Sequence, residues 1–371
     1  MKNTSFLLLC LSCVLILSIS AAAAPQQPGA ATPQPAATAQ PPKAAKPKVS
    51  ILATGGTIAG SAASATQLTG YKPGELTVEQ LIAAVPSLKD FADISAEQIA
   101  NIDSSDMTVD IWLKLAKRIN ALLAGDTSGV VVTHGTDTQE ETVYFLNLTI
   151  KSPKPVVTVG AMRPATALSA DGPLNLLQAV SVAGSDSARG KGAMLVMNGQ
   201  INGAREVTKT NTLQPETFRS NDMGFLGYVV NNKPVFYRGS LRKHTTEAEF
   251  DISKLDRLPK VEIIYGYADA GLEALNGIIA ANPAGIVVAG VGNGTLSGAY
   301  RKPLEEAAKK GIVVVRASRV GTGPVTRDST DDAAGFVVSD SLNAQKARIL
   351  LMLALTKTKD VKDVQRIFDT Y

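Results

Sequence analysis

Short apolar runs alternate with stretches of helical spacing along most of the chain. Val49–Ala53 and Gly129–Thr133 are almost wholly apolar, as strands buried on both faces of a parallel sheet must be. Val109–Leu123 has the spacing of an amphipathic helix, and Thr77–Val85 starts with a Thr and has a Gln three residues on, a helix-capping pattern. The pattern further predicts strands at Glu97–Ile102, Pro155–Val159 and Ala193–Met197, and helices at Gln139–Leu148 and Leu174–Val182.

This alternation predicts an α/β domain with a doubly wound, mainly parallel sheet of the flavodoxin-like kind. Asn231–Lys260 has weaker periodicity and contains two prolines, so we expect a connection there. Three more buried strands and four helices then predict a second, smaller α/β domain. The expected strands are Val261–Tyr265, Gly285–Ala289 and Gly311–Val315, and the expected helices are Leu272–Ala280, Leu296–Lys309, Asn343–Leu355 and Val361–Phe368.

The domain organisation that follows has five parts. Lys2, an apolar run over Phe6–Ile19 and small residues at Ala21–Ala24 predict a cleaved secretory signal peptide over 1–24. A Pro- and Ala-rich stretch over 25–48 predicts a disordered tether. We expect an N-terminal α/β catalytic domain over 49–235, an interdomain linker over 236–260 and a C-terminal α/β domain over 261–371. The signal peptide implies export, and we expect a periplasmic protein.

Composition narrows the chemistry. Both cysteines, Cys10 and Cys13, lie inside the predicted signal peptide, so the exported protein would have neither a Cys nucleophile nor a disulfide. With two histidines in all, a zinc site of the usual Cys/His kind is not available, and we expect no metal. The formal net charge of +4 includes four lysines of residues 1–48. The folded part is therefore about neutral, which argues against nucleic-acid or anionic-membrane partners.

Hydroxyl side chains follow several of the predicted strands. Such polar clusters at strand ends are where an open α/β sheet presents chemistry. A hydroxyl needs a positioned base to act as a nucleophile, and the candidate bases are Tyr71, Asp137 and Lys209. The lone His134 is expected to be a structural hydrogen-bonding residue rather than a base. The candidate nucleophiles are Thr57, Ser104, Thr136 and Thr138.

Glycine-rich turns raise the question of a nucleotide cofactor. Thr54–Gly60 lacks the Gly-Lys-Ser/Thr ending of a phosphate-binding loop. Gly290–Thr295 has only the first two glycines of a dinucleotide fingerprint, and no acidic residue ends the next predicted strand. We therefore expect no cofactor.

Thr54–Gly60 (TGGTIAG) and Thr133–Thr138 (THGTDT) together resemble the paired signatures of bacterial L-asparaginases. The resemblance is closest to the secreted, type II group, which includes the glutaminase-asparaginases, and it extends from about Val49 to Tyr371. Other matching stretches are Asn101–Ser104, Gly160–Pro164, Asp171–Asn175, Thr208–Thr212 and Gly290–Gly294.

The resemblance implies an amidohydrolase of asparagine catabolism, which hydrolyses L-asparagine to L-aspartate and ammonia with some L-glutamine turnover. It implies Thr57 as the nucleophile of an acyl-enzyme, activated by Tyr71, and Lys209 and Asp137 as residues that tune Thr136. It also implies a homotetramer without a cofactor. The substrate-binding residues that it implies are Gly56, Ser104, Ser105, Thr136, Asp137 and, from a neighbouring subunit, Asp269.

The chain departs from the family pattern at three places. Ser105 stands where the family often has Gln or Glu, which leaves the balance of asparagine over glutamine open. Asp269 stands where many members have Asn. The loop expected at Asp328–Asp332 has no Glu, and Asp331 is its candidate substitute.

Two other functions fit the same layout. One is a glutaminase-dominant enzyme of the same family. The other is a secreted protein that binds a small amino acid between two α/β domains without chemistry.

Overall fold

The structure is a computed structural model that describes residues 45–371. The predicted signal peptide and nearly all of the predicted tether lie outside the described residues. Residues 45–371 form one compact unit with two main sheets. None of its helices has both the length and the hydropathy that a membrane crossing requires.

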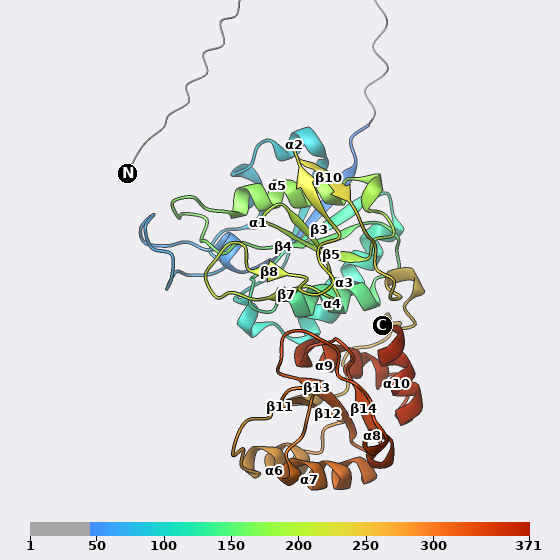
Figure 1. The fold of residues 1–371 in the computed structure, drawn as a ribbon. Coiled ribbons are helices and arrows are strands. Elements are labelled where there is room, and N and C mark those ends of the chain that lie inside the picture. Colours follow the sequence, from blue (N-terminus) through green and yellow to red (C-terminus); the bar gives the residue numbers. More distant parts are fainter. Residues whose placement is uncertain (1–44) are drawn as a thin grey trace, which may run out of the picture. The chain divides into compact units, whose positions relative to one another are not determined.

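The larger sheet has eight strands in the order β10-β9-β6-β5-β4-β3-β1-β2 (Figure 1). Its strands from β2 to β5 are parallel, whereas β6, β9 and β10 pair antiparallel. The parallel part therefore has the order 2-1-3-4-5, which is the flavodoxin-like order and confirms the predicted fold. The strands are β1 (Lys48–Gly55), β2 (Asp93–Ile102), β3 (Gly129–Thr133), β4 (Val156–Val159), β5 (Ala193–Met197), β6 (Gln200–Gly203), β9 (Gly227–Val230) and β10 (Lys233–Phe236).

Five helices accompany this sheet, and α5 packs on β3, β4 and β5 while α3 packs on β2 and β3. A ribbon of two very short strands, β7 (Thr208–Lys209) and β8 (Phe218–Arg219), stands apart from both sheets. The helices are α1 (Val78–Ala83), α2 (Leu88–Phe91), α3 (Val109–Ala124), α4 (Gln139–Thr149) and α5 (Gly172–Ala183), with 3₁₀ turns η1 (Thr57–Ala59), η2 (Ser104–Asp106), η3 (Asp186–Ala188) and η4 (Thr245–Glu247).

The second sheet has four parallel strands in the order β11-β12-β13-β14, as a smaller α/β domain requires (Figure 1). Helix α9 packs on β11 and β12 and also on α4 of the first part. The strands are β11 (Val261–Tyr265), β12 (Gly285–Gly290), β13 (Val313–Ser318) and β14 (Phe336–Val338), and the helices are α6 (Glu273–Ala280), α7 (Gly298–Lys309), α8 (Ser329–Ala334), α9 (Ala344–Ala354) and α10 (Val361–Thr370).

The structure departs from the sequence prediction where elements are short. Strand β10 lies inside Asn231–Lys260, which we expected to be a connection, and its Pro234 is tolerated because β10 is an edge strand. The strand expected at Gly311–Val315 begins at Val313, because Gly311 has φ +89° and terminates the preceding helix. The loop expected at Asp328–Asp332 is the start of α8, where Asp328 caps the helix.

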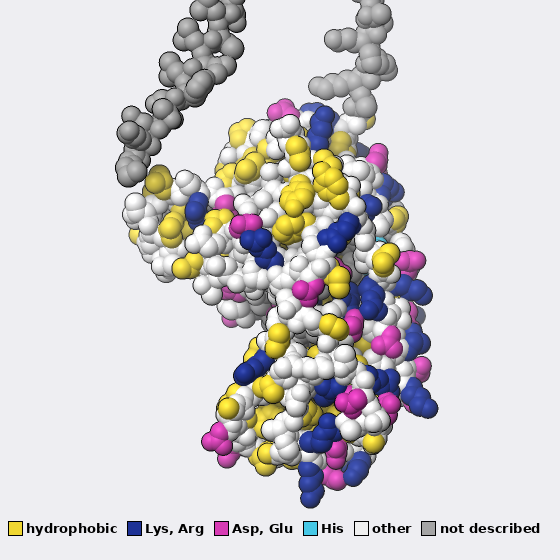
Figure 2. All heavy atoms as spheres, in the orientation of Figure 1, with side chains coloured by type: hydrophobic (Ala, Val, Ile, Leu, Met, Phe, Trp, Pro, Cys, Tyr) yellow, Lys and Arg dark blue, Asp and Glu magenta, His cyan; other side chains and the backbone are white. Residues whose placement is uncertain are grey.

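The surface carries charges of both signs. Figure 2 shows Lys and Arg side chains interspersed with Asp and Glu on the visible face. Apolar side chains gather over the region where Figure 1 shows β10. The exposed apolar residues of β9 and β10 are Tyr228, Val230 and Val235.

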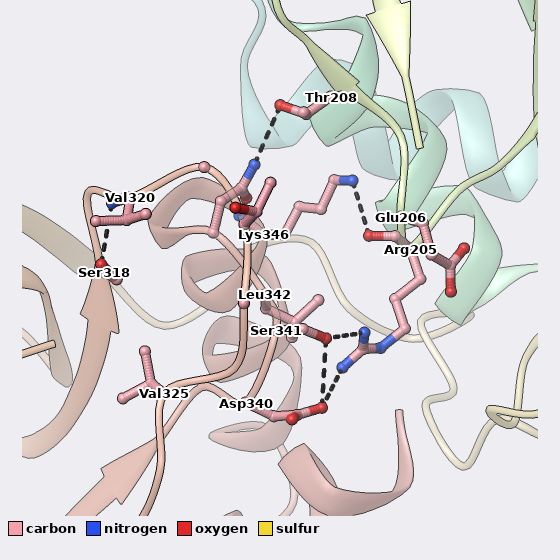
Figure 3. Close-up of a pocket in the computed structure, with 14 residues that line it drawn as sticks. Arg205, Glu206, Thr208, Ser318, Val320, Val325, Asp340, Ser341, Leu342 and Lys346 are labelled. Atoms are coloured by element: carbon pink, nitrogen blue, oxygen red, sulfur yellow. Dashed lines mark hydrogen bonds and ion pairs between the residues drawn. The ribbon is translucent and has the colours of Figure 1, made fainter. Parts of the chain in front are cut away.

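A buried set of ion pairs and hydrogen bonds joins the two parts of the compact unit (Figure 3). Arg205 donates to Asp340 Oδ2 at 3.0 Å and to Ser341 Oγ at 2.7 Å. From α9, Lys346 Nζ donates to the carbonyl oxygens of Arg205, at 2.9 Å, and Val207. Burial lowers the pKa of Lys346 to about 8. The chain just before β7 is therefore held by side chains of the C-terminal part.

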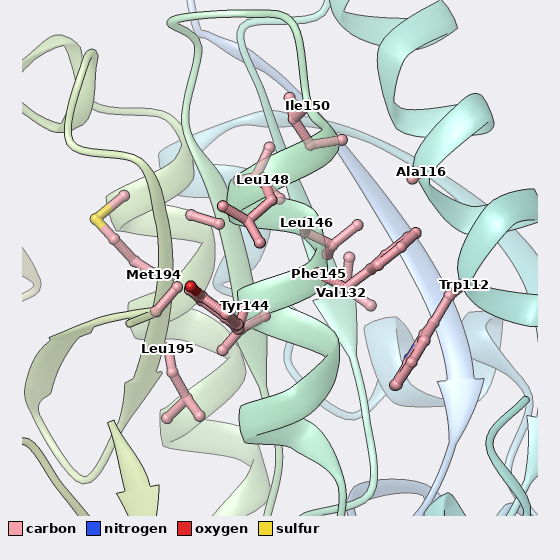
Figure 4. Packing of buried hydrophobic residues seen from close by; sticks show 14 of the residues in the cluster. Trp112, Ala116, Val132, Tyr144, Phe145, Leu146, Leu148, Ile150, Met194 and Leu195 are labelled. Atoms are coloured by element: carbon pink, nitrogen blue, oxygen red, sulfur yellow. The ribbon is translucent and has the colours of Figure 1, made fainter. Parts of the chain in front are cut away.

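Helix α4 lies in the middle of the hydrophobic core. Its Tyr144, Phe145 and Leu146 are completely buried (Figure 4). Phe145 stacks on Trp112 of α3 with ring centroids 5.4 Å apart. Because α4 contacts β4, β5, α3 and α9, it is buried on almost every face, which explains why its sequence lacks a clear polar stripe.

Glu141, in the first turn of α4, should make stability depend on pH. Burial is the main cause that raises the pKa of its carboxyl to about 7; the charge of Arg348 opposes this shift, and that of the neighbouring Glu140 adds to it. The folded state then holds the proton more tightly than the unfolded state. This stabilisation is complete below about pH 4.5 and is lost as pH rises through 7. Glu141→Gln should therefore be more stable than the wild type at pH 8, by about 3 kcal/mol for a shift from 4.5 to about 7, and nearly equal at pH 4.5. Thermal unfolding at the two pH values measures this, and an equal shift at both would contradict it.

Candidate active site

A cavity of about 640 Å³ opens at the carboxyl ends of β1 and β3. This is the switch point of the sheet, because the chain passes from β1 outward to β2 and then back to β3. Open α/β sheets bind their ligands at such points. Six of the residues predicted from the sequence line the cavity: Thr57, Tyr71, Ser104, Thr136, Asp137 and Lys209.

The turn after β1 has room only for glycine. Gly55 and Gly56 have φ of +103° and +83°, a conformation that other residues rarely adopt. A Cβ on Gly56 would lie 2.3 Å from the Cα of Gly135 in the turn after β3. A Cβ on Gly55 would lie 2.4 Å from the carbonyl oxygen of Ile102. The three turns after β1, β2 and β3 therefore pack backbone to backbone, and Thr57 emerges at their junction.

Thr57 and Tyr71 form the first hydroxyl pair, with 2.7 Å between Thr57 Oγ1 and the Tyr71 hydroxyl. Thr57 is 8% exposed. The loop that carries Tyr71 is fastened by a bridge between Ser61 and Lys72, and the tyrosine ring lies against Gly60. Burial raises the pKa of Tyr71 more than the hydrogen bond with Thr57 lowers it, and the charge of Asp137 raises it further. At neutral pH Tyr71 is therefore a phenol, able to relay a proton but not present as a tyrosinate base.

Lys209 joins the second group of side chains. Its Nζ donates to Thr136 Oγ1 at 2.9 Å and to Asp137 Oδ1 at 2.5 Å. The side chain of Asp137 is 61% exposed and that of Lys209 only 18%. One face of the carboxylate is thus open to a ligand, while the ammonium is enclosed. Since Thr136 Oγ1 accepts from Lys209, its own proton is free for another acceptor.

Ser104 fixes the turn after β2 to the turn after β3. Its Oγ accepts a hydrogen bond from the Asp137 amide at 3.2 Å, and its carbonyl oxygen accepts one from the Thr138 hydroxyl at 2.8 Å. A Cβ on Gly135 would lie 2.6 Å from Ser104 Oγ. These contacts set the position of Asp137 relative to Ser104, so that a carboxylate and a hydroxyl face one cavity.

His134 is structural, as its isolation in the sequence indicated. It is completely buried, and desolvation lowers its pKa to about 4. Nδ1 lies 2.6 Å from the carbonyl oxygen of Gly135, so Nδ1 carries the proton and Nε2 accepts from the Thr142 hydroxyl at 2.8 Å. Trp112 Nε1 donates to the same hydroxyl at 2.7 Å. The neutral imidazole thus stabilises the turn after β3 through its hydrogen bond to the Gly135 carbonyl oxygen.

Three other predicted residues lie elsewhere. Gly56 supports the turn but is not part of the cavity lining, and Ser105 is exposed outside the lining. Asp269, with φ +58°, lies in the C-terminal part on a separate cavity of about 370 Å³. The suggestion that Asp331 could serve as an acidic site residue is wrong, because it is fully buried and pairs with Arg316 through two hydrogen bonds of 2.7 and 2.6 Å.

The sequence analysis did not identify several residues at the site. Asp103 lines the cavity and caps the amide of Ser105. Asp171 accepts hydrogen bonds from the amides of Met162 and Arg163, at 3.0 and 2.9 Å, and so shapes the cavity wall. Both acids lie in stretches that resemble the family, Asn101–Ser104 and Asp171–Asn175, but the sequence analysis assigned neither of them a role. Within residues 45–371, no cluster of His, Cys, Asp and Glu could hold a metal ion.

Comparison with known proteins covers nearly all of the described chain. A family model described as "Asparaginase, N-terminal" matches residues 48–242, and one described as "Glutaminase/Asparaginase C-terminal domain" matches residues 260–368. The chain is 53% identical over 327 residues to L-asparaginase 2 of Bacillus subtilis, spanning 88% of this chain and 87% of that protein. It is 54% identical over 327 residues to a protein of Haemophilus influenzae named "Probable L-asparaginase periplasmic", spanning 88% and 93%.

A solved structure resembles this one throughout. It is titled as a probable cytoplasmic L-asparaginase from Campylobacter jejuni, and it aligns with a TM-score of 0.87 and 52% identity over 88% of this chain and all of that chain. The two-domain arrangement derived above is therefore shared with an experimental structure.

Proposed function

The chain belongs to the asparaginase and glutaminase family, and we propose that it hydrolyses the side-chain amide of L-asparagine to L-aspartate and ammonia, with L-glutamine as a slower substrate. The observation that carries the proposal is that two sets of residues, each containing a threonine hydroxyl, line one cavity. Thr57 with Tyr71, and Thr136 with Asp137 and Lys209, all line it. This set supplies a nucleophile and proton-handling groups without cysteine, catalytic histidine or metal.

The substrate is a zwitterion, and the cavity offers a partner for each charge. The open carboxylate of Asp137 suits the α-ammonium group, since a charge-assisted hydrogen bond is stronger than a neutral one. Ser104 suits the α-carboxylate as a hydrogen-bond donor. We propose that Gly56 and Ser105 contribute to this substrate-binding subsite indirectly, because each belongs to a turn that forms part of it. The side-chain amide would then extend toward Thr57.

The reaction that we propose has two steps. In the first, Thr57 Oγ1 forms a bond to the amide carbon, the carbon–nitrogen bond breaks, and the hydroxyl proton passes to the leaving nitrogen, which departs as ammonia. In the second, water adds to the ester, the bond to Thr57 breaks and the threonine regains its proton. Because Tyr71 is a phenol in the free protein, it acts as a relay rather than a resident base. Lys209 and Asp137 likewise handle protons for Thr136 or for a water beside it.

Asp269 bears on the proposed assembly. It lies outside the cavity of its own chain, which is what delivery to a neighbouring subunit would require. We therefore propose a homotetramer in which Asp269 completes the site of another subunit. Sedimentation equilibrium measures the mass, and a monomer with full activity would refute the proposal.

The proposed location is the periplasm. The relatives disagree, because one is named periplasmic and another is titled cytoplasmic. The proposal rests on the N-terminal pattern of Lys2, an apolar run and small residues. We likewise propose the domain division 49–235, 236–260 and 261–371. Determining the first residue of the protein isolated from the periplasmic fraction tests cleavage near residue 24; an intact Met1 would contradict it.

Thr57→Ala should strongly slow the hydrolysis of asparagine, because alanine cannot form the acyl-enzyme. We expect kcat to fall by roughly 10³-fold or more, with the residual rate coming from the rest of the site. Thr57→Ser keeps the hydroxyl and should retain far more activity, which makes it the matched control. The measurement is ammonia release from L-asparagine and from L-glutamine at saturating concentration.

The outcomes separate the candidate functions. No ammonia from either amide by the wild type would favour an amino-acid-binding protein without chemistry. A faster rate with glutamine would favour a glutaminase-dominant enzyme. Near wild-type activity of Thr57→Ala would exclude Thr57 as the nucleophile.

A further inference from the structure

Glu140 is a buried carboxylate next to the cavity that does not line it. Its side chain is 4% exposed, in the first turn of α4. Oε2 accepts a hydrogen bond from the main-chain N–H of Lys209 at 2.7 Å. Oε1 accepts from Asn343 Nδ2 at 3.1 Å and from Gln345 Nε2. The three donors lie 69, 203 and 205 positions away from Glu140 in the chain.

The segment that carries Lys209 has little support of its own. Strand β7 has only two residues and pairs only with β8. A ribbon this short is a weak restraint on a side chain that must reach a defined point. Besides local bonds to Thr217, two buried side chains from other elements hold the segment. Lys346 of α9 binds the carbonyl oxygens of Arg205 and Val207, and Glu140 of α4 binds the amide of Lys209. Figure 3 shows Lys346 reaching the chain at Arg205.

The anchor and the target of Lys209 belong to the same end of α4. Thr136 and Asp137, which receive the Lys209 ammonium, lie immediately before the helix, and Glu140 lies three residues after Asp137. Lys209 is thus attached to one rigid element twice, through its amide and through its Nζ. Its ammonium can occupy only a small region while both attachments hold.

We propose that Glu140 is a positioning residue for Lys209, and that it links the N-terminal end of α9 to the catalytic groups. The proposal rests on the role proposed for Lys209 above. Glu140 acts through the Lys209 main chain and does not touch substrate. Catalysis is sensitive to such placement, because a displacement of about 1 Å in a reacting group can cost about 10²-fold in rate.

Glu140→Gln is the sharpest test. Both oxygens of the carboxylate accept hydrogen bonds, whereas a glutamine has one acceptor and one donor. In either orientation the amide therefore sets a donor against a donor, at Lys209 or at the pair Asn343 and Gln345. We expect kcat for L-asparagine to fall about 10–100-fold, while KM changes by less than about 3-fold because Asp137 and Ser104 keep their places.

A double-mutant cycle with Lys209→Met distinguishes positioning from general damage. Lys209→Met alone should lower kcat by about 10²–10⁴-fold, as loss of a proton-handling group does. If Glu140 acts through Lys209, adding Glu140→Gln to Lys209→Met should lower kcat by less than about 3-fold further. Glu141→Gln is the matched control, since it removes the adjacent carboxylate of the same helix and should leave kcat unchanged.

Three results would overturn the proposal. They are an unchanged kcat in Glu140→Gln, the same fold-loss with and without Lys209, or an equal loss in Glu141→Gln. Failure of the proposed function is separately visible, since the wild type would then release no ammonia or Lys209→Met would be fully active. Circular dichroism checks that each variant folds.

A second variant covers the case in which Glu140→Gln does not fold. Gln345→Ala removes one donor to Glu140 Oε1 and leaves the carboxylate in place. We expect a smaller fall in kcat, about 2–5-fold, that disappears in the Lys209→Met background. A fall that persists there would refute the coupling of α9 to Lys209.

Discussion

The structure depends on the close approach of main chain at the ends of three parallel strands. Gly56 meets Gly135, Gly55 meets Ile102, and Ser104 meets Gly135, each at a separation that leaves no room for an added side chain. Parallel strands bring their carboxyl ends to one edge, but ordinary side chains would keep the turns apart. Because glycines remove that spacing, the hydroxyl of Thr57 and the polar groups of Thr136 and Asp137 can line one cavity.

Helix α4 connects this junction to the rest of the molecule. Its body is core, with Tyr144 and Phe145 fully buried. Thr136 and Asp137 lie just before its first turn. Within that turn, Glu140 binds both the Lys209 segment and the start of α9. A helix packed on every side cannot shift without disturbing the core. The site is therefore built on a helix enclosed by the core, which suits a reaction that depends on placement.

The larger fold was predictable because its signals are local. Apolar strands such as Gly129–Thr133, and the Thr77 cap with Gln80, are found where the pattern put them. The two-residue strands β7 and β8 and the edge strand β10 were not predicted, since elements so short are decided by tertiary contacts. The same holds for Asp331, which read as a loop acid and is buried against Arg316. An ion pair between residues 15 positions apart leaves no periodic pattern in the sequence.

By itself the sequence determined the strand and helix order, the glycine turns and the types of residue available for chemistry. It thereby pointed to hydroxyl nucleophiles, because cysteine is confined to residues 10 and 13 and histidine is scarce. Only the tertiary structure decided which groups meet. It joined Tyr71 to Thr57, brought Lys209 to Thr136 across 73 positions, and left Asp269 outside the cavity. Such pairings depend on how turns and helices pack in space, and a one-dimensional pattern carries no record of those distances.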